Sequence, residues 1–301
     1  MTGLEWIGYP QIVLALWCPL LAFAVGNLLL RRRMPPRARF VIGVCAASTP
    51  AAALCVPYLP GLPFLGDLPW RAPLVWGISS PSIAYSGVAL FLLDMATLFL
   101  LAGPCIGMAV QAVRVCRSHR KLVALPGYQV DGLRVVTGRS QGRTACTSGL
   151  FRPVIHVGEG IHRSSQASAV IAHERAHARA RHLLWISLAE GLTMAWVWMP
   201  GRRRLITHIR LAAELWADEE ARCRVGDREL AQALLAQLGG SLSDPVVPGR
   251  RPTSSAVGFS TADMLLVRAE ALTCPPVQWS RRTTSSVVAM AAAAGLLVVL
   301  L

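Results

Sequence analysis

Charged residues are scarce in this 301-residue chain, where Asp, Glu, Lys and Arg together make up only 15% of the sequence. An ordinary soluble domain carries roughly 25% charged residues. Hydrophobic residues, by contrast, reach 53%. This balance argues against an ordinary soluble domain and predicts a membrane protein.

Acidic residues and lysine are the scarcest charged types. The chain has 16 acidic against 30 basic residues, a formal net charge of +14, and Lys121 is its single lysine. Nucleic-acid binding could use such a charge, but the arginines gather beside apolar segments, as they do on the cytoplasmic flanks of membrane spans. We therefore expect no direct contact with nucleic acid.

No two of the eight cysteines form a C-x-x-C pair, and several lie inside apolar runs. A thiolate zinc site and a disulfide framework both need cysteines in recognisable spacings. The sequence therefore predicts neither of them.

Long apolar runs are present, and they predict about four transmembrane helices in a mainly α-helical membrane protein. The first run, 11–30, is followed by three arginines at 31–33. A cleaved signal peptide carries its positive charges before the apolar core, so this run is expected to remain as an anchor. Further spans are expected at 40–59, at 84–113 and, near the C-terminus, at 285–301.

The charge pattern divides the chain into three predicted parts. Residues 1–121 are expected to form a membrane domain with three transmembrane helices, and residues 283–301 a C-terminal transmembrane helix. Residues 122–282 between them are more polar and are expected to face the cytoplasm as an α+β domain. An apolar hairpin at 183–200 has arginines at both ends, so we expect it to dip into the bilayer rather than cross it. The predicted location is the cell (inner or plasma) membrane, with several passes.

The middle part begins with two strand patterns. Residues 128–138 predict a hairpin that turns at Asp131-Gly132, and Pro153 within 147–158 predicts an edge strand there. A substrate would add its backbone to that edge near Val154 to Val157. Helices are predicted to follow at 165–182, 203–225, 227–239 and 261–272.

The sequence AHERAH contains the pattern H-E-x-x-H at His173, Glu174 and His177. Residues four apart share one face of a helix, so both imidazoles can bind one metal ion. Zinc lowers the pKa of its bound water toward ~7, and a nearby carboxylate takes the proton during attack on a carbonyl. The composition gives about 0.005 such matches by chance. We therefore expect two zinc ligands, His173 and His177, and a catalytic base, Glu174.

A third ligand is expected on the next amphipathic helix. Catalytic zinc takes three protein ligands and keeps one position for water. In RLAAELWADEEA, Glu214 and Asp218 are again four apart, so Glu214 is the predicted ligand and Asp218 would accept the free N–H of a ligand histidine. His208 and Arg210 precede them and could stabilise an oxyanion. A role on the helix surface is the alternative for these two residues.

These motifs resemble the integral-membrane zinc peptidases of the BlaR/MecR antirepressor class, which are gluzincins. The segments that carry the resemblance are AHERAHARARHLLW, AWVWMPGRRRLITHIRLAAELWADEEA, FRPVIHVGEGI and MLLVRAEALTCPP. They lie between about 145 and 275. The resemblance implies an α+β gluzincin-like domain with one Zn²⁺ per chain, and HtpX-like proteases are more distant relatives.

One position departs from that pattern, since the residue five places after the second motif histidine is commonly acidic and is His182 here. Beta-lactam sensing by this chain is not expected. The predicted function is an integral-membrane zinc endopeptidase that cleaves cytoplasmic or membrane proteins, with a transcriptional repressor as one candidate substrate. The sequence leaves open whether the chain forms a homo-oligomer. Alternatives are an HtpX-like quality-control protease, a non-catalytic zinc-binding receptor or scaffold, and a channel or transporter suggested by Asp94.

Overall fold

The computed structural model describes residues 10–55, 87–138, 145–243 and 262–274, together with Ser286 and Ala289. The longer helices are α1 (Pro10–Leu30), α2 (Pro36–Cys55), α5 (Gly87–Val123), α7 (Ala167–Ala180), α8 (His182–Leu192), α9 (Arg202–Val225), α10 (Asp227–Ser243) and α11 (Ala262–Thr273). The short helices are α6 (Glu159–His162) and the 3₁₀ turn η3 (Met194–Trp196). The strands are β1 (Gly127–Val130), β2 (Leu133–Gly138), β3 (Ala145–Ser148) and β4 (Val154–Gly158).

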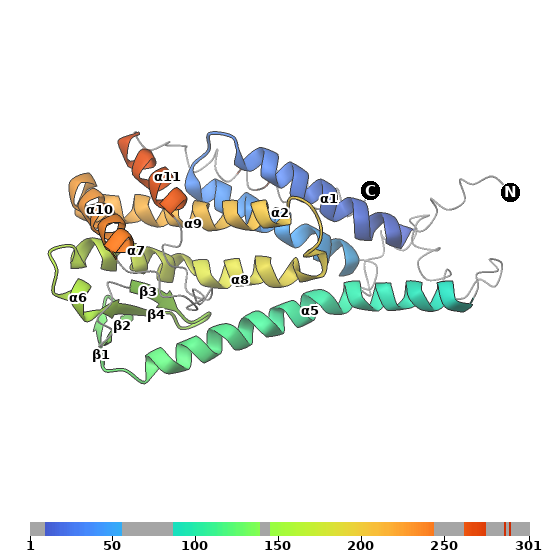
Figure 1. Cartoon of the computed structure of the whole chain (residues 1–301), viewed down its shortest axis with the longest axis horizontal. Coiled ribbons are helices and arrows are strands. Elements are labelled where there is room, and N and C mark those ends of the chain that lie inside the picture. The colour runs from blue at the N-terminus through green and yellow to red at the C-terminus, as the bar shows by residue number, and fades with distance from the viewer. Residues whose placement is uncertain are drawn as a thin grey trace.

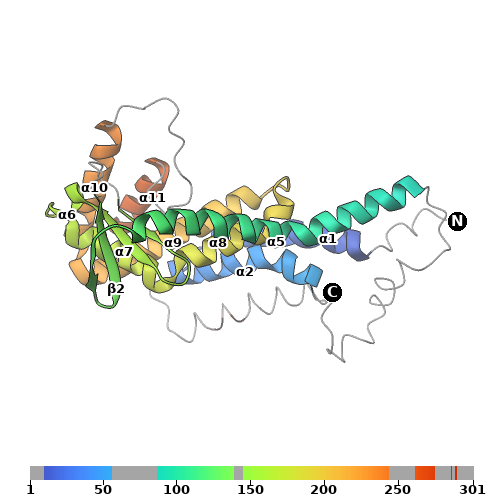
Figure 2. The ribbon, with the colours of Figure 1, turned by 90° about the horizontal axis from the view of Figure 1, so that it is seen from below.

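The described elements fall into two regions along the long axis of the molecule. The helices α1, α2, α5, α8 and α9 run along this axis, and the sheet lies at one end of them with α6, α7, α10 and α11 (Figures 1 and 2). α7 and α8 follow one another along the same line, so α7 continues the bundle into the region of the sheet (Figure 1).

The four strands form one sheet in the order β1-β2-β4-β3. The predicted hairpin is confirmed: β1 and β2 pair antiparallel around Asp131 and Gly132, which both have positive φ (47° and 79°), as a two-residue hairpin turn requires. The predicted edge strand is wrong. β4 lies inside the sheet, parallel to β2 and antiparallel to β3. Pro153 precedes the first paired residue of β4, so its missing N–H leaves the ladder intact.

The main hydrophobic core joins the N-terminal helices to the middle of the chain. Phe23 and Leu30 of α1 and Phe40 of α2 are buried in one cluster with Leu205 and Ile209 of α9. Ile186 and Ala189 of α8 and Trp196 are buried in the same cluster. A smaller core lies between the sheet and α7.

The predicted transmembrane helices are not found, because no helix among the described residues is both long enough and apolar enough to cross a membrane. Some apolar side chains of α1 and α2, among them Phe23, Leu30 and Phe40, pack into the core shared with α8 and α9. Others on α1 are exposed, namely Trp17, Leu21, Val25 and Leu28. α8 and η3, where a bilayer-dipping hairpin was expected, contribute to the same core. The predicted fold class of a membrane protein with four transmembrane helices is therefore wrong. The prediction of a multi-pass location in the cell membrane rested on the same spans and is wrong with it.

Two predictions concern parts of the chain outside the described residues and side chains. The expected span at 285–301 falls outside the described residues apart from Ser286 and Ala289, and the side chain of Asp94 is not described.

The predicted helix 165–182 is broken near its end. Arg181 adopts a left-handed conformation (φ 52°), which ends α7 at Ala180 and starts α8 at His182. Left-handed residues commonly terminate helices. Just beyond this break, the ring of His182 contacts the ring of His177, with centroids 4.9 Å apart.

Candidate metal centre

Three buried side chains from two helices converge to form a candidate metal site. His173 and His177 lie on α7 and Glu214 lies on α9, and their ligand atoms are all within 4.8 Å of one another. The two Nε2 atoms are 3.0 Å apart. Glu214 carboxylate oxygens lie 3.4 Å from Nε2 of His173 and 3.6 Å from Nε2 of His177. This group can hold a metal ion.

The separations also test which ion the group would fit. Ligands at 2.0 to 2.1 Å from a tetrahedral zinc ion lie about 3.3 Å from one another. The two Nε2 atoms are 3.0 Å apart, Oε2 of Glu214 lies 3.4 Å from His173, and Oε1 of Glu214 lies 3.6 Å from His177, so all three separations are close to this value. Two imidazoles and one carboxylate are also the donor set of known catalytic zinc sites. The group can therefore hold a metal ion, and its donor set is one that zinc takes in proteins.

Small residues bring the two ligand-bearing helices together. On α7, Ala169, Ala172 and Ala176 are buried, and on α9, Ala213 and Ala217 are buried beside Glu214. Alanine side chains allow helix axes to approach closely, at the lower end of the usual 8–10 Å range. The spacing of four residues then places His173 and His177 on the face of α7 turned toward Glu214.

Glu174 is fully buried, and a residue of the sheet holds it by a hydrogen bond. Thr147 of β3 donates its hydroxyl hydrogen either to Oε2 of Glu174, at 2.7 Å, or to the backbone oxygen of the same residue, at 3.0 Å. The other carboxylate oxygen, Oε1, has no hydrogen-bond partner among the described residues. One oxygen is thus anchored and the other is free to hold a proton. No sequence pattern pointed to Thr147 as a site residue.

Asp218 and Arg268 support the ligands from behind. Asp218 Oδ1 lies 2.9 Å from Nδ1 of His173, so it accepts the ring N–H and leaves Nε2 for the metal, as the sequence predicts. Arg268 of α11 is 1% exposed and donates to both oxygens of Asp218, at 2.6 and 2.5 Å. Its Nη1 also lies 3.0 Å from Glu214. Sequence reasoning missed this arginine as a site residue.

Charge pairing fixes the ionisation of these groups. Burial opposes ionisation of Glu214, but Arg268 and His177 outweigh it and hold the pKa of Glu214 well below its ordinary value. Burial and Arg268 lower the pKa of His173, but hydrogen bonds to Asp218 and Glu214 outweigh both and raise this pKa to about 9. The carboxylates are therefore ionised, and they attract positive charge to the position between the imidazoles.

His177 is supported by a second histidine rather than by a carboxylate. Nδ1 of His182 lies 2.8 Å from Nδ1 of His177, and both rings are buried. Burial, together with the charge of His177, lowers the pKa of His182 to about 2, so this ring is neutral. With Nε2 of His177 directed at the metal position, its Nδ1–H donates and Nδ1 of His182 accepts. The ring of His182 is held in turn by Phe40 and Trp216.

Two predicted residues are not brought into the cluster. Arg210 forms an ion pair with Glu190 of α8, with Nε 3.0 Å from Oε1. Burial lowers the pKa of His208, and the nearby charges of Arg39, Arg204 and Arg31 lower it further. These contacts join helices of the bundle and give no support to an oxyanion role.

Comparison with known proteins leaves this geometry as the main guide. No protein-family model and no curated protein matches the chain.

Proposed function

We propose that the protein is a zinc-dependent peptidase. One buried arrangement carries the proposal. His173, His177 and Glu214 converge, and Glu174, the residue after His173 on α7, has a carboxylate oxygen, Oε1, without a hydrogen-bond partner among the described residues. The resemblance of residues 145–275 to gluzincin peptidases supports the same chemistry. Zinc, when bound, supplies a Lewis acid that polarises a carbonyl and lowers the pKa of water.

The protein's own residues divide the remaining tasks. His173, His177 and Glu214 bind the ion, and Asp218, Arg268 and His182 hold these ligands in orientation. Glu174 takes the proton from the attacking water at Oε1 and passes it to the leaving amine. Thr147 donates a hydrogen bond to Oε2 of Glu174 and so holds this carboxylate in place. Because this carboxylate is buried, its charge acts with little screening by solvent.

The sheet suggests how an extended peptide would reach the site. β3 pairs on one side with β4 and has no strand on its other side among the described residues. The same strand carries Thr147, which contacts Glu174. An extended substrate that adds to this edge would therefore lie beside the catalytic base. β3 replaces the 154–157 strand as the proposed docking edge.

Cleavage of a peptide library by the purified full-length chain, with product N-termini identified by mass spectrometry, tests the proposal. We expect wild type to cleave peptides and to lose this activity on zinc chelation. Glu174→Gln should retain one zinc per chain and lose cleavage, because the amide cannot accept the proton. The matched control is Glu270→Gln, an exposed site on α11 that should stay active.

The zinc and cleavage readouts separate the outcomes. Wild-type activity that survives zinc removal, or an active Glu174→Gln variant, would refute the proposed mechanism. A transcriptional repressor remains the candidate substrate to test once the cleaved peptide sequences are known.

A further inference from the structure

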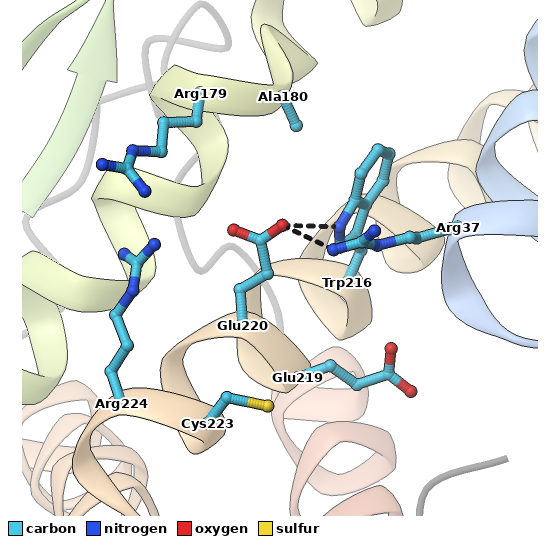
Figure 3. A pocket seen from close by; sticks show the side chains of 8 residues that line it. All are labelled: Arg37, Arg179, Ala180, Trp216, Glu219, Glu220, Cys223 and Arg224. Atoms are coloured by element: carbon cyan, nitrogen blue, oxygen red, sulfur yellow. Dashed lines mark hydrogen bonds and ion pairs between the residues drawn. The ribbon is translucent and has the colours of Figure 1, made fainter. Parts of the chain in front are cut away.

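A cleft of about 550 Å³ lies where α7, α9 and α2 meet (Figure 3). Its lining residues are Arg37, Arg179, Ala180, Trp216, Glu219, Glu220, Cys223 and Arg224. On α9, Trp216 and Glu220 lie on roughly the opposite face from Glu214 and Asp218, since each residue advances the helix by about 100°. The cleft is therefore separate from the metal centre.

One side of the cleft is already held together by internal contacts. Glu220 Oε1 accepts hydrogen bonds from Arg37, at 2.8 Å, and from the indole N–H of Trp216, at 3.2 Å. The guanidinium of Arg37 lies 5.1 Å from the centre of the Trp216 ring. Figure 3 shows these three side chains grouped on one side. They form a fixed wall whose charges largely cancel.

The other side of the cleft carries two arginines that are not bound to a carboxylate in the way that Arg37 is bound to Glu220. Arg179 comes from α7 and Arg224 from α9, and their guanidinium groups extend toward the same space in Figure 3. Neither forms an ion pair or hydrogen bond with any residue that the structure describes. Burial, followed by the nearby charges of Arg175 and Arg179, lowers the pKa of Arg224. The charges of Glu220 and Asp131 act in the opposite direction on Arg224 but only partly offset this effect. The two arginines therefore place a net positive charge on this side of the cleft.

We propose that Arg179 and Arg224 bind a phosphate-type oxyanion between them. Guanidinium groups present planar pairs of N–H donors that match the oxygens of phosphate, and two such groups on different helices can each engage a separate oxygen pair. A tetrahedral anion suits this arrangement better than a planar carboxylate, which offers only two oxygens. The inference is independent of the proposed peptidase activity.

The site also lies close to a support of the metal centre. The Trp216 ring forms one wall of the cleft and packs against His182, with ring centroids 4.7 Å apart. His182 in turn contacts His177. Two side chains therefore separate the bound oxyanion from a metal ligand.

Isothermal titration of the full-length, zinc-loaded chain with inorganic phosphate at low, constant ionic strength tests the proposal. We expect saturable binding of one phosphate per chain, weakened tenfold or more in Arg179→Gln/Arg224→Gln. The control is Arg203→Gln/Arg204→Gln, which removes the same charge from exposed positions of α9 and should bind phosphate as wild type does. The zinc ligands are unchanged in every variant, so any direct phosphate contact with zinc contributes equally.

Three results would overturn the inference: phosphate uptake that does not saturate, an equal loss of affinity in the control variant, or acetate binding as tight as phosphate binding. A soluble phosphomonoester, glycerol 3-phosphate, forms a second arm of the titration. Binding of both compounds assigns the cleft to phosphoryl groups in general, and binding of phosphate alone restricts it to the free ion.

Discussion

Replacement of His182 by Phe probes how strongly a neutral histidine supports the metal ligand His177. Phenylalanine keeps a ring of similar size against Phe40 and Trp216, whose centroids lie 4.8 and 4.7 Å from that of His182. It removes the acceptor that lies 2.8 Å from Nδ1 of His177. The ligand then carries a buried N–H with no partner.

The magnitude follows from the cost of that group. A buried donor without a partner costs about 1–3 kcal/mol. If the cost falls on the metal-bound state, this corresponds to roughly 5- to 150-fold weaker zinc binding. Loss of a residue that supports a metal ligand typically weakens metal binding 10–100-fold. We therefore expect His182→Phe to weaken zinc binding about 10- to 100-fold, as measured by competition with a chromophoric chelator.

The matched variant is His182→Asn, whose Oδ1 can take the place of Nδ1 and accept the same hydrogen bond. It should bind zinc within about threefold of wild type, because it restores the acceptor. Unchanged affinity in His182→Phe would refute the role of the hydrogen bond. Equal losses in both variants would assign the effect to packing against Phe40 and Trp216.

Three further predictions concern groups around the centre and in the sheet. Thr147→Val should keep zinc and lower kcat about fivefold, since a hydrogen bond is worth about 1 kcal/mol; Thr147→Ser should restore kcat, and a Val variant with wild-type kcat would exclude the contact. Arg268→Met should destabilise the fold by about 3–5 kcal/mol in urea unfolding, because it leaves Asp218 as a buried charge without its partner; a loss below about 1 kcal/mol would contradict the ion-pair account. Burial lowers the pKa of His156 below its ordinary 6.5, so the unfolded chain binds more protons and stability should fall as the pH drops below about 6.5. The drop in unfolding free energy between pH 8 and pH 5.5 should be smaller in His156→Gln, and an identical drop would argue against this contribution.

The local part of the metal site could be predicted from the sequence, because helical geometry alone places His173, Glu174 and His177. Glu214 and Asp218 follow from the same four-residue spacing on one later helix. Arg268 could not be located in this way, since it is 50 residues beyond Asp218 and reaches the site only through the packing of α11. Thr147 likewise reaches Glu174 only because β3 lies against α7.

The membrane prediction failed for a different physical reason. Apolar runs such as 11–30 satisfy a hydropathy criterion whether their side chains face lipid or a protein core. Here Phe23 and Leu30 are buried in one core cluster with residues of α2 and α9, whereas Trp17, Leu21, Val25 and Leu28 of the same helix are exposed. Arg181 also escaped prediction, because a left-handed non-glycine residue is uncommon and the surrounding pattern favours a continuous helix. This residue separates α7 from α8, and His182 directly after it contacts His177.

Comparison of newly formed protein N-termini in cells that carry the wild-type chain or Glu174→Gln tests the central claim most directly. The account predicts N-termini that are present with wild type and absent with the variant, while both proteins hold zinc. A few cleaved proteins, with a transcriptional repressor among them, would indicate regulated cleavage. Identical sets of N-termini in the two cultures would contradict the claim that this metal centre hydrolyses peptide bonds.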